Sequence, residues 1–100
     1  MIERTLLIRS RLGLHARAAA KLVRVASGFH SNVLLKRIDS PGGANVSADA
    51  KSILSVLMLA ASCGTELQAS AEGTDEEAAM NAIEQVFAEG FGEMEPESSI

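Results

Sequence analysis

Alternation of apolar and polar residues predicts two β-strands. Residues 2–9 place three apolar side chains of four on one face. Residues 66–72 do the same with Leu67, Ala69 and Ala71. A repeat of two residues is typical of a strand with one buried face.

A weaker alternation predicts two further strands in the middle of the chain. One covers residues 32–38, with Val33 and Leu35 pointing inward, and a shorter one covers residues 46–48. Residues 39–45, DSPGGAN, are rich in turn formers and predict an exposed hairpin loop between these strands.

Helical spacing of apolar residues predicts the first helix over residues 16–27. Its apolar face carries Ala19, Leu22, Val23 and Ala26. These positions follow the i, i+3, i+4, i+7 pattern of an amphipathic helix. Arg17, Lys21 and Arg24 lie on the opposite, polar face. Gly28 is expected to end the helix with a positive φ, which glycine adopts without strain.

The second predicted helix, residues 53–60, is short and apolar nearly all round. Val56, Leu59 and Ala60 make one stripe, and Ile53, Leu54 and Leu57 make another. A helix of about two turns on a small domain normally buries only one stripe. The second stripe is therefore expected to be exposed, and an exposed apolar patch often marks a docking surface.

The third predicted helix begins with a capping box, in which Glu77 follows Thr74 by three residues. Its core stripe consists of Ala79, Ala82, Ile83, Val86 and Phe87. Gly90 is expected to end it. Residues 93–100 are acidic and predict a mobile C-terminal tail beyond a single domain of residues 1–92.

These elements follow the order β-α-β-β-α-β-α. Four strands and three helices in 100 residues predict an α+β domain, with the helices on one face of a mainly antiparallel sheet. Apolar residues make up 47% of the chain, which is enough for a core, but Trp and Tyr are absent. The core must therefore be aliphatic.

Charge and composition exclude several classes of function. The net charge is −4, the chain has no basic tract, and only three residues are aromatic. Nucleic-acid binding is therefore not expected. No apolar run approaches the ~20 residues that span a bilayer, so neither membrane insertion nor a signal peptide is predicted. One Cys and two His predict neither a disulfide nor a metal cluster. A cytoplasmic protein without a cofactor fits best.

His15 is the strongest candidate for chemistry because it directly precedes the first helix, after Gly13. A helix N-terminus offers unpaired N–H groups and a partial positive charge, which favour a neutral imidazole and stabilise a bound anion. The backbone N–H groups of Ala16, Arg17 and Ala18 would face such an anion. The Arg17 guanidinium could fork onto its oxygens. These are the requirements of a phosphohistidine.

Simpler interpretations remain open for each of these residues taken alone. His15 could merely cap a helix, and Arg17 could be a solvated charge on the polar face. Ser52 could be only the N-cap of the second helix. His30 is expected at the surface, and Cys63 is expected to be a structural loop residue.

Three segments resemble the HPr family, the histidine-containing phosphocarriers of the bacterial phosphotransferase system. GLHARAAA (residues 13–20) resembles the active-site signature of the family. KSIL (51–54) is similar to the segment with its regulatory serine, and GTDEEAAMNAIEQVF (73–87) to its last helix. The resemblance implies an open-faced β-sandwich with strand order 1-4-2-3.

The resemblance also implies roles for individual residues. His15 would accept a phosphoryl group on Nδ1 from phospho-enzyme I and pass it to an enzyme IIA-type protein. Arg17 would stabilise the phosphate. Ser52 would be the substrate of an HPr kinase/phosphorylase where one exists. Partners would dock on a surface formed by Arg17, Lys21 and Arg24 together with Ile53, Leu54 and Leu57. The carrier would be a monomer. It would not be an enzyme, because its own histidine is the covalent intermediate.

Two departures from the family pattern leave alternatives open. Ala18 stands where most members have proline, and the hairpin over residues 39–44 is about six residues longer than in the common form. The carrier could serve sugar uptake or a nitrogen-related pathway. The rival hypotheses are a regulatory interaction protein of the same fold that no longer relays phosphate, and a small-ligand sensor domain.

Overall fold

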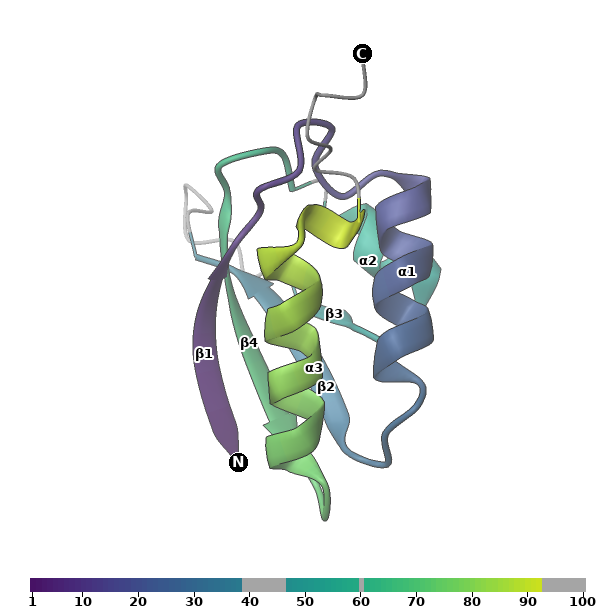
Figure 1. Cartoon of the computed structure of the whole chain (residues 1–100), viewed down its shortest axis with the longest axis vertical. Helices are drawn as coiled ribbons and strands as arrows, with labels where there is room; N and C mark the ends of the chain where they lie inside the picture. The colour runs from purple at the N-terminus through teal and green to yellow at the C-terminus, as the bar shows by residue number, and fades with distance from the viewer. Residues whose placement is uncertain (39–46, 60, 93–100) are drawn as a thin grey trace.

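The computed structural model describes residues 1–38, 47–59 and 61–92. The elements follow the predicted order along these ranges (Figure 1). They are β1 (Ile2–Leu7), α1 (Ala16–Ala26), β2 (Asn32–Arg37), β3 (Ser47–Asp49), α2 (Ile53–Met58), β4 (Glu66–Glu72), α3 (Glu76–Ala88) and a 3-10 turn, η2 (Gly90–Gly92). The predicted hairpin at 39–45 and the tail at 93–100 lie outside the described residues.

The four strands form one sheet in the order β1-β4-β2-β3, and all three neighbouring pairs are antiparallel. In the register, Leu67 of β4 lies opposite Leu6, and Leu35 of β2 lies opposite both Ala69 and Ala48. Inward-pointing side chains of adjacent strands therefore sit side by side. The predicted α+β class and the strand order 1-4-2-3 are confirmed.

All three α-helices cover the same face of the sheet (Figure 1). The opposite face is open, and outward residues of its strands such as Thr5, Leu34 and Lys36 are exposed. None of the helices in the described ranges is long and apolar enough to cross a bilayer. The fold is therefore an open-faced sandwich of one sheet and one helical layer.

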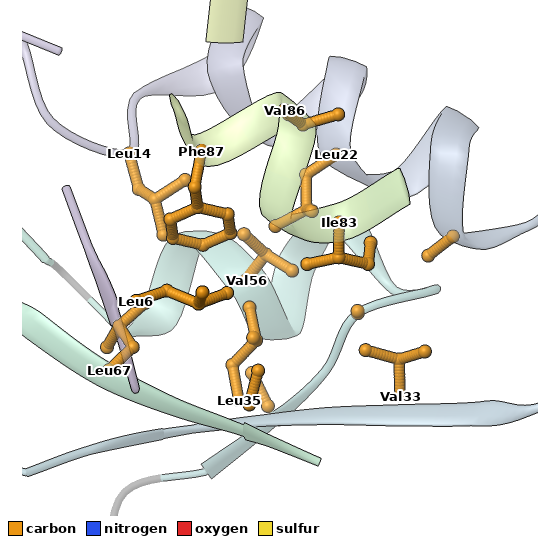
Figure 2. Packing of buried hydrophobic residues seen from close by; sticks show 14 of the residues in the cluster. Leu6, Leu14, Leu22, Val33, Leu35, Val56, Leu67, Ile83, Val86 and Phe87 are labelled. Atoms are coloured by element: carbon orange, nitrogen blue, oxygen red, sulfur yellow. The ribbon is translucent and has the colours of Figure 1, made fainter. Parts of the chain in front are cut away.

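The core lies between the sheet and the helices and is mostly aliphatic (Figure 2). Leu22 from α1, Val56 from α2 and Ile83 from α3 are fully buried above Leu35 and the other inward residues of the sheet. The inward residues predicted for β2 and β4 are all fully buried, namely Val33, Leu35, Leu67, Ala69 and Ala71. The strand alternation therefore predicted the sheet side of the core correctly.

The predicted N-cap of α3 and the predicted role of Gly28 at the end of α1 were wrong, and α2 ends at Met58 rather than at residue 60. The N-cap of α3 is Asp75 rather than Thr74, so the capping box with Glu77 does not form. Gly28 does not adopt a positive φ. The C-cap of α1 is Ser27, which has ordinary αR backbone angles. The N–H groups of Gly28 and Phe29 instead bond back to Val25 and Ala26, which closes the last turn tightly.

The Asp75 side chain is diverted from helix capping to a contact between distant elements. Its carboxylate accepts the backbone N–H groups of His30 and Ser31, each at 2.9 Å, and the hydroxyl of Ser31. These hydrogen bonds, led by that of the Ser31 hydroxyl, lower the pKa of Asp75 from 3.8 to about 2. Asp75 thereby ties the start of α3 to the start of β2.

We expect Asp75→Asn to lower the melting temperature at neutral pH and to flatten the acid limb of the stability curve. The folded-state pKa is lowered, so the carboxylate contributes its full stabilisation above pH 3.8 and loses it as the pH falls toward 2. Urea unfolding of both proteins at several pH values measures this. A wild-type curve parallel to that of Asp75→Asn between these pH values would contradict the expectation.

Candidate functional site

The loop between β1 and α1 lies at one end of the sheet (Figure 1), and His15 is its last residue, directly before α1. Buried Ile8 and Leu14 anchor its two ends in the core. Gly13 has a φ of 69°, and a Cβ at this position would lie 2.6 Å from the carbonyl oxygen of Ala61. The backbone before His15 therefore passes directly against the segment that follows α2.

His15 is the N-cap of α1, as the sequence predicted. Its backbone is extended, and its Nδ1 accepts the N–H of Arg17 at 3.3 Å. A ring nitrogen that accepts a hydrogen bond carries a lone pair, so the neutral ring holds its proton on Nε2. The half-buried imidazole thus directs the Nδ1 lone pair toward the first turn of α1.

The first turn of α1 is suited to an anion. The first intrahelical bond runs from Ala19 N–H to the His15 carbonyl at 2.8 Å. The N–H groups of Ala16, Arg17 and Ala18 therefore have no carbonyl partner within the helix. No acidic residue occupies this turn. The positive end of the helix is thus not neutralised by a local carboxylate.

Three cations follow one face of α1 at spacings of four and three residues. Arg17 and Arg24 are exposed, and Lys21 is half-buried. None of them joins either ion pair found among the described residues, Met1–Glu76 and Arg4–Glu84. This face remains positively charged beside His15, although the whole chain is acidic.

The second helix exposes part of its predicted patch. Ile53 and Leu54 are 42% and 66% exposed, whereas Leu57 packs against the core. The prediction that Leu57 belongs to the exposed stripe was therefore wrong in part, because its side chain is partly buried. Met58, which is 70% exposed, was missed although it lies one turn after Leu54. The exposed residues Ile53, Leu54 and Met58 are called the α2 patch below.

Ser52 is the N-cap of α2, and its hydroxyl accepts the N–H of Ser55 at 3.3 Å. Its neighbour Lys51 donates from Nζ to the carbonyl of Phe29, just beyond α1, at 2.8 Å. Ser52 is half-buried, and it directly precedes the exposed Ile53 and Leu54. A charge added to its hydroxyl would therefore lie beside the α2 patch.

The remaining candidates show no such environment. His30 is exposed, and its backbone N–H binds Asp75. Cys63 is exposed, with its Sγ 4.0 Å from the Arg9 carbonyl oxygen. Leu12, three residues before His15, is 73% exposed, and the sequence interpretation did not single it out. Among the described residues, no three His, Cys, Asp or Glu side chains gather as metal ligands would.

The fold and the site define a class: a small open-faced sandwich that presents a histidine at the N-terminus of its first helix. Residues 2–89 match the model of a family described as "PTS HPr component phosphorylation site". The chain therefore belongs to the HPr family, the phosphocarriers of the phosphotransferase system.

Individual relatives agree with this assignment. The chain is 45% identical to phosphocarrier protein HPr of Xylella fastidiosa (strain 9a5c), over 93% of this chain and 98% of that protein. It is 35% identical to phosphocarrier protein NPr of Escherichia coli (strain K12), over 92% and 97%. The crystal structure of HPr-C-His from Thermoanaerobacter tengcongensis superposes with a TM-score of 0.83 at 37% identity, covering 95% of this chain and all of that chain.

Proposed function

We propose that His15 carries the phosphoryl group, which it accepts on Nδ1 from phospho-enzyme I and passes to an enzyme IIA-type protein. The observation that supports this role most directly is the hydrogen bond at the N-terminus of α1, in which His15 Nδ1 accepts the backbone N–H of Arg17 at 3.3 Å. In the neutral ring, this nitrogen carries the lone pair that would attack phosphorus.

The transfer balances without an added acid or base on this chain. As the bond from Nδ1 to phosphorus forms, the bond from phosphorus to the donor residue of enzyme I breaks, and the proton on Nε2 stays in place. The phosphoryl oxygens would replace Nδ1 as the acceptor for the Arg17 N–H, and they would also accept the N–H groups of Ala16 and Ala18. The Arg17 guanidinium would add a charge-assisted contact. Transfer to the next protein reverses these steps.

Labelling tests this proposal directly. The chain is incubated with enzyme I, Mg²⁺ and ³²P-phosphoenolpyruvate, and the label is then exposed to acid. We expect an acid-labile label that is absent from His15→Gln and present in the matched variant His30→Gln. A label that survives His15→Gln, or no label on the wild type, would refute the proposal. The latter result would favour a regulatory protein that no longer relays phosphate.

The partners are proposed to dock on two adjoining surfaces. The first is the cationic face of α1, made of Arg17, Lys21 and Arg24. The second is α2, where Ile53, Leu54 and, at its inner edge, Leu57 contribute apolar contact. A positive face beside an apolar patch is complementary to an acidic groove with an apolar floor. The carrier would act as a cytoplasmic monomer.

Ser52 is proposed as a regulatory site for an HPr kinase/phosphorylase. We expect Ser52→Asp to slow phosphoryl acceptance from enzyme I roughly tenfold, because the charge lies beside the docking surface. The melting temperature should hardly change, since Asp is also a good N-cap. Initial labelling rates measure the effect, with the exposed Ser47→Asp of β3 as the control. Equal rates for Ser52→Asp and wild type would contradict this role.

Ala18 is proposed to be tolerated in place of the usual proline. We expect Ala18→Pro to transfer phosphate within about tenfold of the wild-type rate, because this N–H makes no bond within the helix and the N–H groups of Ala16 and Arg17 would still face the phosphate. Ala20→Pro, one turn into α1, is the contrasting variant and should destabilise the fold by about 3 kcal/mol. A larger loss of transfer in Ala18→Pro would show that the Ala18 N–H is required.

A further inference from the structure

The turn between α2 and β4 lies directly against the loop that carries His15. Leu14 N–H donates to the Ala61 carbonyl at 2.9 Å. On the other side of the loop, Ile8 N–H donates to the Thr65 carbonyl at 2.9 Å, and Gly64 N–H donates to the Ile8 carbonyl at 2.8 Å. The turn is therefore hydrogen-bonded to both ends of the loop that carries His15.

Thr65 holds this turn in shape. Thr65 is only 6% exposed, and its Oγ1 accepts the N–H of Ser62 at 3.2 Å. Its own N–H donates to the Ser62 carbonyl at 3.0 Å. Ser62 in turn forms the wall behind Gly13, where a Cβ would come within 2.8 Å of the Ser62 Cα. A shift of Ser62 would thus move the backbone two residues before His15.

We infer that Thr65 is a positioning residue for phosphoryl transfer, acting through Ser62, Ala61 and Leu14 on the orientation of His15. The inference rests on the proposed function. Thr65 does not touch the phosphate. Its hydroxyl fixes the position of Ser62, and residues 61–62 pack against the loop that carries His15. The position of that loop sets the direction of the Nδ1 lone pair. In-line transfer depends on this direction, since reacting groups must be aligned to within a fraction of an ångström.

The test compares Thr65→Val, which replaces the hydroxyl by a methyl of similar size, with Thr65→Ser, which keeps the hydroxyl. Thr65→Ala removes the hydroxyl without adding a methyl. Thr5→Val, at an exposed position of β1, is the matched control. Two measurements are made on each full-length variant: kcat and KM for phosphorylation by enzyme I, and amide hydrogen exchange at Leu14.

For Thr65→Val and Thr65→Ala we expect kcat to fall roughly fivefold to tenfold with KM within about twofold, because alignment rather than docking is lost. Exchange at the Leu14 amide should quicken, while exchange at the fully buried Leu35 of the sheet stays as in the wild type. Thr65→Ser should restore both values. A purely structural role would instead quicken exchange at Leu14 and Leu35 alike.

Two results would overturn the inference. In the first, Thr65→Val matches wild type in kcat and in Leu14 exchange. In the second, Thr65→Ser is as slow as Thr65→Val. Failure of the proposed function would look different, because the wild type would then take no label while exchange at Leu14 would still respond to Thr65→Val.

Discussion

Gly13→Ala should both destabilise the fold and nearly abolish phosphoryl transfer. The new Cβ would lie 2.6 Å from the Ala61 carbonyl oxygen and 2.8 Å from the Ser62 Cα, and both are backbone atoms that cannot rotate away. The φ of 69° adds strain for any residue with a Cβ. Together, the clash and the strained φ should lower the free energy of unfolding by about 3 kcal/mol.

The effect on transfer follows from the same contact. If the loop moves away from Ala61, the Leu14 hydrogen bond breaks and His15 changes its position at the mouth of α1. A misplacement of about 1 Å can cost roughly a hundredfold in rate, and we expect a loss of that order. Labelling by enzyme I at a temperature where the variant is still folded, checked by circular dichroism, measures it.

Gly92→Ala is the matched control. Gly92 also has a positive φ, of 79°, but a Cβ there would meet nothing within 4 Å, and it lies outside the turn of residues 61–65. Gly92→Ala should lose only the cost of the φ angle, about 1–2 kcal/mol, and retain transfer. If Gly13→Ala is no worse than Gly92→Ala in either measurement, the contact with residues 61–62 does not determine the position of His15.

The second large effect is expected for Gly73→Ala, at the opposite end of the fold. Gly73 has a φ of 154°, and a Cβ would lie 2.6 Å from both the Cα and the Oγ of Ser31. Any adjustment would disturb the hydrogen bonds of Ser31 to Asp75, which join β2 to α3. We expect a loss of about 3–4 kcal/mol, or a fall in melting temperature of about 15 °C.

This variant should leave the chemistry of His15 intact, because its site is at the other end of the sheet. The measurement is urea unfolding at pH 7, followed by labelling at low temperature where the variant remains folded. Gly92→Ala serves as the control, since its φ is also positive, at 79°, and its Cβ would meet nothing within 4 Å. Equal stability of the two variants would show that Ser31 moves away from the new Cβ at little cost in free energy.

Local pattern in the sequence determined the elements and most of the core. The alternation over residues 66–72 predicted β4 with its ends and its buried side. Successive side chains of a strand point to opposite faces, so every second residue of a half-buried strand is apolar. The position of His15 as the N-cap of α1 could also be predicted from local sequence, since an N-cap involves only neighbouring residues. The strand order came from the resemblance to the HPr family rather than from periodicity.

Contacts between distant residues decided what the pattern could not. Thr74 and Glu77 satisfied the local rule for a cap, but Asp75 became the N-cap and its carboxylate binds Ser31, 44 residues away. The exposure of Met58 and the burial of Leu57 depend on how α2 rotates against the rest of the core, which its nearly uniform apolar sequence leaves undetermined.

The sequence by itself therefore determined the fold's elements, the place of His15 before α1 and the cations beside it. Only the tertiary structure decided how His15 is held. Residues 61–65 are about fifty positions from His15 along the chain, and nothing in their composition marks them as a support. Their role arises because the sheet places β4 next to β1, so the turn before β4 meets the loop after β1.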